Sequence, residues 1–204
     1  MGQDNPLLLL AMLVAAGVAG KWWLDDYRAA RRGTPHPRAL PGATAAPLGA
    51  VMLAAGGALV LLAGETAGEF ALDVSGEQSR MTVLFGGYTL AAAFIEELLF
   101  RGFLVVENRG RAALLAGIVG ASALFALLHP FLWEWSEGRL LVHPGAKAWW
   151  STAAVFAGSL WFYAVRFLPN NPGRSLLPCF AAHAAKNLGV FAVKYALGFV
   201  SGWW

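Results

Sequence analysis

The run Phe94-Ile95-Glu96-Glu97-Leu98-Leu99-Phe100-Arg101-Gly102 places three ionisable side chains inside a stretch that is otherwise apolar. A charged side chain at the centre of a membrane helix costs about 2.5–3.5 kcal/mol on insertion scales. Such residues are therefore expected where they form ion pairs or have a function. Glu97 and Arg101 are four residues apart and share one helix face, whereas Glu96 points about 100° around the helix. We therefore expect a buried ion pair beside a second, separately directed carboxylate.

The whole chain has the composition of a membrane protein. Of its 204 residues, 58% are hydrophobic and 13% are charged, whereas soluble domains carry about 25% charged residues. The mean hydropathy is +0.56, and the 24 glycines and 9 tryptophans fit helices that cross a bilayer. Trp149-Trp150 is expected to anchor a helix at the interface. The net charge of +3 comes from basic residues that flank apolar runs, so we expect contact with lipid and no nucleic acid.

Six apolar stretches approach the roughly 20 residues that a bilayer-crossing helix needs. They are Pro6–Leu24, Ala45–Gly64, Met81–Val106, Ala112–Trp133, Ala148–Leu168 and Pro178–Val200. We predict an all-α fold, a polytopic transmembrane helical bundle of about six spans. The first stretch lacks a basic leader and is followed closely by Lys21 and an Asp-Asp pair, so we expect a retained span rather than a cleaved signal peptide.

Charge in the loops predicts the orientation of the chain. Arg28, Arg31, Arg32 and Arg38 surround the first loop, which we assign to the cytoplasm, with the N-terminus outside. We expect two parts: residues 1–80, two spans with this basic loop, and residues 81–204, a core that holds the polar motifs. The protein is expected to be integral to a membrane, and its Ala-, Gly- and Arg-rich sequence suggests a bacterial inner membrane.

Two later spans carry further polar residues at helical spacing. His183 and Asn187 are four residues apart on the last span, and Phe125 and His129 repeat that spacing on the fourth. An isolated residue of this kind often forms only an interhelical hydrogen bond, worth about 0.6–2 kcal/mol in membranes. The combination is different, because a purely structural bundle has little reason to hold a second carboxylate, two imidazoles and an amide beside an ion pair.

The three motifs resemble those of a known family. Glu96-Glu97-x-x-x-Arg101, Phe125-x-x-x-His129 and His183-x-x-x-Asn187 occur in order on separate apolar spans, a pattern similar to that of the CAAX-protease and bacteriocin-processing proteins, which include the type II CAAX prenyl endopeptidases. The resemblance covers roughly residues 81–200. It implies a glutamate-type intramembrane endopeptidase that uses no metal or other cofactor, with a site formed by Glu96, Glu97, Arg101, His129, His183 and Asn187.

Physical chemistry suggests a role for each of these groups. Glu96 and His129 would hold and deprotonate a water molecule, while His183 and Asn187 would donate hydrogen bonds to the developing oxyanion. Glu97 would orient Arg101, which could alternatively contact the substrate. The family implies cleavage near the C-terminus of a membrane-anchored or lipid-modified protein or peptide. The Ala-, Gly- and Arg-rich composition suggests a bacterial protein, which favours a peptide, a signal remnant or a C-terminal sorting helix as the substrate.

Other mechanisms and functions are open from the sequence. Two histidines and a glutamate could bind zinc, although the His-Glu-x-x-His pattern is missing. Ser122 lies in a Gly-Ala-Ser-Ala run that resembles the serine motif of rhomboid proteases, and Cys179 lies one turn before His183. Outside hydrolysis, intramembrane carboxylates also serve proton relays in transporters. A non-catalytic immunity or scaffolding protein is a further alternative.

A simple layout of six alternating spans does not bring these residues together. It puts His183 near the cytoplasmic start of its helix and His129 near the external end of its own. We expect Pro130 to force His129 out of helical geometry and the loop 133–147 to dip back into the protein. Asn171-Pro172 is a possible start for the last helix. With such adjustments, we expect the polar groups to meet within the membrane.

Overall fold

A computed structural model of the chain describes residues 6–203. Its elements, in order, are α1 (Pro6–Arg31), α2 (Leu48–Ala71), the 3-10 turn η1 (Ser75–Glu77), α3 (Val83–Glu97), the π-helical segment η2 (Leu98–Phe103), α4 (Arg111–Leu128), β1 (Trp133–Ser136), β2 (Arg139–Val142), α5 (Ala146–Phe167) and α6 (Leu177–Ala196). The two strands form one antiparallel hairpin in which Ser136 pairs with Arg139. The all-α architecture is confirmed, since the hairpin is a minor addition to the helices.

Four of these helices are long and apolar enough to cross a membrane: α1, α2, α3 with η2, and α4. Each of the six predicted spans coincides with a helix, but α5 and α6 do not meet that measure. Their lower apolar content has a simple cause. α5 includes Ser151, Thr152 and Ser159, and α6 includes His183 and Lys186, all of them buried. These buried polar side chains lower the mean hydropathy of α5 and α6.

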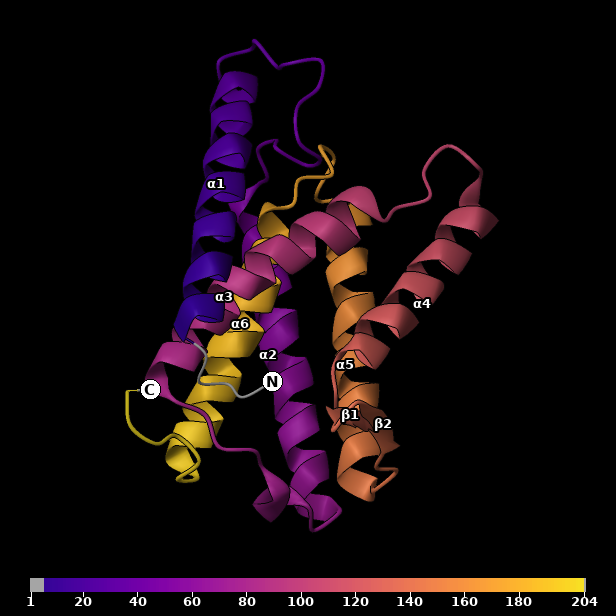
Figure 1. Cartoon of the computed structure of the whole chain (residues 1–204). Coiled ribbons are helices and arrows are strands. Elements are labelled where there is room, and N and C mark those ends of the chain that lie inside the picture. The colour runs from indigo at the N-terminus through magenta and orange to yellow at the C-terminus, as the bar shows by residue number, and fades with distance from the viewer. Residues whose placement is uncertain (1–5, 204) are drawn as a thin grey trace.

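The helices run alternately up and down, so the connections gather at two ends (Figure 1). Loops 32–47, 104–110 and 168–176 lie together at the upper end, where Thr44 donates a hydrogen bond to the Gly173 carbonyl at 3.0 Å and Arg174 pairs with Glu107 at 3.0 Å. Segment 72–82 and the hairpin lie at the lower end. We call these the arginine end and the hairpin end.

Helix α2 packs along α5 and α6 through small residues. Ala54 and Ala58 are fully buried in the core. Gly57 receives the Trp161 indole of α5, and a Cβ atom at Gly57 would lie 2.2 Å from that ring. The Trp161 indole N–H then donates to the Ala54 carbonyl at 2.9 Å. This close approach of helices through small residues is the usual packing mode in bilayers.

Trp150 makes the same kind of contact about three turns further along α2. A Cβ at Gly68 would lie 2.0 Å from its ring, and its indole N–H donates to the Glu65 carbonyl at 3.0 Å. Trp150 therefore joins α2 to α5, while its neighbour Trp149 is 58% exposed.

One predicted helix limit and one predicted loop conformation were wrong for reasons that lie in local chemistry. The first helix continues past Leu24 to Arg31, stabilised by the Lys21–Asp25 pair at 2.7 Å, and ends before Gly33, whose φ of +77° leaves the helical region. The loop 133–147 does not dip back into the bundle. It forms the β-hairpin, whose turn residues Glu137 and Gly138 both have positive φ, the backbone shape of a tight two-residue hairpin turn.

The last helix begins at Leu177 and not at Asn171. Asn171 is 1% exposed, and its amide nitrogen donates to the carbonyls of Val165, Arg166 and Ser175 at 3.0–3.2 Å. It therefore satisfies carbonyl groups that the end of α5 leaves without helical partners. The Asn171-Pro172 pair resembles a helix start, but Asn171 caps the C-terminal end of α5.

Gly57→Ala should lower the unfolding midpoint of the detergent-solubilised protein, because the added methyl group displaces the Trp161 ring. Overpacking of this kind costs about 1–3 kcal/mol. Gly56→Ala is the matched control, since a Cβ there meets no atom within 4 Å. Equal midpoints for the two variants would contradict the proposed packing of α2 on α5.

Candidate active site

A cavity of about 790 Å³ opens among helices α2 to α6 and includes four of the six predicted site residues in its wall: Glu96, His129, His183 and Asn187. They come from α3, the end of α4, and α6. The Phe125 ring joins this wall, with centroids 4.7 Å from the His129 ring and 6.1 Å from the His183 ring. The polar groups thus surround one space, although a simple layout separates them.

The other two predicted residues, Glu97 and Arg101, lie behind the wall. Both side chains are fully buried, and neither lines the cavity. Arg101 Nη1 donates to Glu97 Oε1 at 3.1 Å, and Nη2 donates to Ser159 Oγ at 2.5 Å. The guanidinium also stands over aromatic faces, 4.5 Å from the Phe125 centroid and 4.9 Å from that of Tyr163. Hydrogen bonds and ring faces together compensate a cation that is out of water.

The Glu97 carboxylate connects this buried cation to the cavity. The same Oε1 that accepts from Arg101 lies 2.7 Å from His183 Nδ1. Because an ionised carboxylate only accepts hydrogen bonds, Nδ1 carries a proton. His183 Nε2 then faces Glu96, whose Oε2 lies at 3.7 Å, and the Phe162 ring stacks on the imidazole at 4.8 Å. His183 is thereby held between two carboxylates in one orientation.

His129 is oriented by a backbone carbonyl that the end of α4 leaves free. Pro130 disfavours helical geometry at the preceding residue, and His129 has φ −78° and ψ 121°, as expected. Its backbone N–H turns to the Ala126 carbonyl at 3.3 Å. The Phe125 carbonyl is then available to His129 Nδ1, at 2.8 Å. Since a carbonyl accepts, Nδ1 carries the proton of the neutral ring, and Nε2 keeps its lone pair.

Asn187 is fixed from α3. Its amide nitrogen donates to the Thr89 carbonyl at 3.0 Å. An amide NH₂ group has two donor hydrogens, so one remains for a ligand in the cavity. Glu96 is the most accessible acid beside it, with a side chain that is 33% exposed. The cavity therefore offers a carboxylate and an imidazole that can accept protons, and an amide that can donate a hydrogen bond.

The comparisons with known proteins agree with this geometry. The sequence profile described as type II CAAX prenyl endopeptidase Rce1-like matches residues 78–189, more than half of the chain and a segment that contains all three motifs. The chain belongs to this Rce1-like family. No curated protein and no solved structure matches the chain. The family predicted from the three motifs is thus confirmed.

Helix α2, which precedes the segment matched by the Rce1-like profile, supplies part of the cavity wall. Glu65 Oε2 lies 3.0 Å from Lys186 Nζ, and both side chains are at most 16% exposed. The Lys186 ammonium lies against Gly158, where a Cβ would come within 3.3 Å of Nζ. One turn further along α2, Glu69 pairs with Lys147 of α5 and accepts from Gln78.

Neither Glu65 nor Lys186 was predicted as a site residue. Glu65 lies just outside the predicted second span, which ends at Gly64, whereas α2 continues to Ala71. A signal existed for Lys186, which is three residues beyond His183 and so lies on the same helix face. Its partner Glu65 lies on another helix, so residue spacing within one helix could not identify it.

The alternative nucleophiles do not reach the cavity. Ser122 is fully buried behind the wall and accepts a hydrogen bond from Ser159 Oγ at 3.0 Å. Cys179 is also fully buried, and its thiol lies 3.2 Å from the Phe162 carbonyl. Within residues 6–203, no three His, Cys, Asp or Glu side chains converge as a set of metal ligands.

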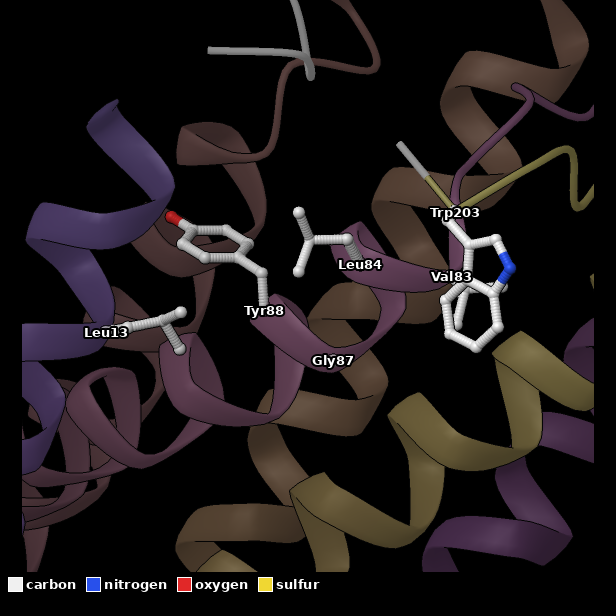
Figure 2. Close-up of a pocket in the computed structure, with 6 residues that line it drawn as sticks. All are labelled: Leu13, Val83, Leu84, Gly87, Tyr88 and Trp203. Atoms are coloured by element: carbon white, nitrogen blue, oxygen red, sulfur yellow. The ribbon is translucent and has the colours of Figure 1, made fainter. Parts of the chain in front are cut away.

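A second hollow, of about 950 Å³, is different in character. It lies between α1, the start of α3 and the C-terminal segment, and Figure 2 shows its apolar and aromatic lining: Leu13, Val83, Leu84, Gly87, Tyr88 and Trp203. Tyr88 is the one residue of this set that also lines the polar cavity. The apolar hollow has no set of acids and bases, so the chemistry of this chain is sought in the polar cavity.

Arg101→Met should destabilise the protein by about 3–5 kcal/mol, because it leaves the Glu97 carboxylate buried without its cation. Glu97→Gln should be similarly harmful, while the double variant Glu97→Gln/Arg101→Met should recover most of the loss, since no lone charge is left. The measurement is the unfolding midpoint in detergent.

The exposed Lys21–Asp25 pair is the control, and Asp25→Asn should lower the midpoint far less than Arg101→Met, because an exposed pair contributes little to stability. Strictly additive losses in the double variant would show that Glu97 and Arg101 do not act as a pair.

Proposed function

We propose that this chain is an intramembrane endopeptidase in which Glu96 and His129 activate a water molecule for attack on a peptide bond. The observation that carries the proposal is the set of proton acceptors and hydrogen-bond donors that line the cavity. An accessible carboxylate and an imidazole with an unprotonated Nε2 line the same cavity as the Asn187 amide of α6, which can donate a hydrogen bond. Membership of the Rce1-like family supports a protease of the CAAX endopeptidase kind.

In the attack step, the water oxygen bonds to the carbonyl carbon of the substrate, and the proton of the water moves to Glu96 or to His129 Nε2. General base catalysis of this kind contributes about 10²–10⁴-fold to the rate. In the collapse step, the C–N bond breaks, and the same proton passes to the leaving amine nitrogen. Water supplies the hydroxyl group that the acyl product gains and the hydrogen that the amine product gains, so no redox partner is required.

The developing oxyanion would be stabilised from α6. Asn187 has one donor hydrogen beyond the one that the Thr89 carbonyl accepts. His183 can donate from Nε2 in its doubly protonated form, and its ring nitrogens lie near two carboxylates, Nδ1 at 2.7 Å from Glu97 and Nε2 at 3.7 Å from Glu96. Donors held in place before the reaction stabilise a transition state strongly, because they need no reorganisation. Glu97 and Arg101 are positioning residues in this scheme, since they act through His183.

The substrate in this proposal is a membrane-anchored protein or peptide, cut near its C-terminus. Residues 81–204 would form the protease core. Residues 1–80 would contribute two spans with the arginine-rich loop in the cytoplasm, and α2 would add Glu65 to the cavity wall. The membrane would be the inner membrane of a bacterium.

Glu96→Gln and His129→Gln should each lower peptide cleavage at least about 100-fold, because each removes a proton acceptor from the cavity. The assay uses purified protein in detergent with a library of N-palmitoylated peptides, and mass spectrometry detects the products. Gly56→Ala is the matched active control, since Gly56 does not line the cavity. Wild-type rates in Glu96→Gln and His129→Gln would exclude the mechanism, and cleavage lost to a chelator would point to a metalloprotease.

Pro130→Ala should lower kcat about tenfold or more with little change in KM. Without the proline, α4 can continue through His129, and the backbone N–H of His129 then competes for the Phe125 carbonyl that orients the imidazole. The variant should remain folded, with an unfolding midpoint no lower than that of the parent. Pro144→Ala, in the exposed stretch after the hairpin, is the matched control. An unchanged kcat in Pro130→Ala would show that this carbonyl does not set the His129 tautomer.

A further inference from the structure

The cavity is closed at one end and open at the other. Its innermost wall is made of buried side chains, among them Phe162, His183 and Phe125. Directly behind them lies a layer that is fully buried, which contains Arg101 and Tyr163. This layer stands between the cavity and the arginine end. No residue of loops 32–47, 104–110 or 168–176, all within the described chain, lines the cavity.

The opposite limit of the cavity is a rim of exposed residues at the hairpin end. Glu77 and Ser79 come from the segment after α2, and His143 and Gly145 come from the segment after β2. Lys194 at the end of α6 donates to the Ser79 carbonyl at 2.6 Å and so joins this rim. Water and polar chain segments can therefore enter from the hairpin end and approach Glu96 from that side.

The two ends of the molecule differ in charge. The arginine end has Arg28, Arg31, Arg32, Arg38, Arg109, Arg111, Arg166 and Arg174, against Asp25, Asp26 and Glu107. At the hairpin end, the basic residues of the described chain are Arg80, Arg139, Lys147, Lys186 and Lys194, against Glu65, Glu69, Asp73, Glu77, Glu134 and Glu137. Lys147 is paired with Glu69. Short loops rich in Lys and Arg stay in the cytoplasm, so the hairpin end lies outside it.

We infer that the active-site cavity opens on the extracytoplasmic side of the membrane. This inference extends the proposed function. The substrate is then a membrane-anchored polypeptide whose cleavable segment is exposed on that side, such as the remnant of a protein that has already been exported. A segment that remains in the cytoplasm would meet the closed layer of Arg101 and its aromatic neighbours. The exposed Trp135 of the hairpin, 65% accessible, fits an interfacial position at the mouth.

The orientation can be tested by cysteine labelling, because the native Cys179 is fully buried and serves as a silent background. Gly76→Cys places a thiol beside the mouth, at an exposed position where a Cβ meets no atom within 4 Å. Thr34→Cys places one in the exposed arginine-rich loop. Intact spheroplasts that express each full-length variant are treated with a membrane-impermeant biotin maleimide, before and after permeabilisation with detergent.

The expected result is strong labelling of Gly76→Cys in intact spheroplasts. Thr34→Cys should gain at least about tenfold in labelling on permeabilisation, and the parent protein should stay unlabelled. The reverse pattern, with Thr34→Cys labelled in intact spheroplasts and Gly76→Cys only after permeabilisation, would overturn the inference, as would equal labelling of both.

The same experiment in a Glu96→Gln background separates this inference from the proposed function. Labelling reports orientation and needs no catalysis, so the pattern should be unchanged there. If the labelling is as expected but no peptide is cleaved in the purified assay, the protease proposal fails while the orientation stands.

Discussion

The contact between Glu97 and Arg101 is the interaction on which the rest of this structure depends. Both side chains are fully buried, and a charge in such a place is tolerated only with a partner and hydrogen bonds. The partners come from several helices: Ser159 from α5, His183 from α6, and the ring of Phe125 from α4. The pair therefore compels α3, α4, α5 and α6 to converge, and the cavity is the space that remains next to the point of convergence.

Much of this arrangement could be predicted from the sequence, because it follows from spacing within single helices. The four-residue separations of Glu97 from Arg101 and of His183 from Asn187 predicted shared faces, and both expectations agree with the structure. Pro130 predicted the extended backbone of His129. The contact between His183 and Glu97 was not predicted, since it depends on how α3 and α6 cross, which spacing within one helix does not determine.

The features that were missed share the same cause. Glu65 meets Lys186 across two helices, and Asn171 acts on the carbonyls of α5 only because the chain folds back there. Each is a polar residue whose role is set by a partner distant in the sequence. Glu65 also lies before the segment that the Rce1-like profile matches. The wall of the cavity is thus built from more of the chain than the family motifs cover, because α2 packs along α6 through small residues.

The π-helical segment η2 has a consequence for the length of the chain. A π-turn spans i to i+5, so it accommodates one residue more than an α-turn. Tyr163 holds the backbone of this segment in place. Its hydroxyl donates to the Phe100 carbonyl at 2.7 Å, and the Leu104 carbonyl lies 3.2 Å from the same oxygen. Loss or gain of one residue between Glu97 and Leu104 would rotate the rest of this segment by about 100° and displace these carbonyls from Tyr163. Surface loops can lengthen or shorten during evolution, but this short segment has to keep its residue count.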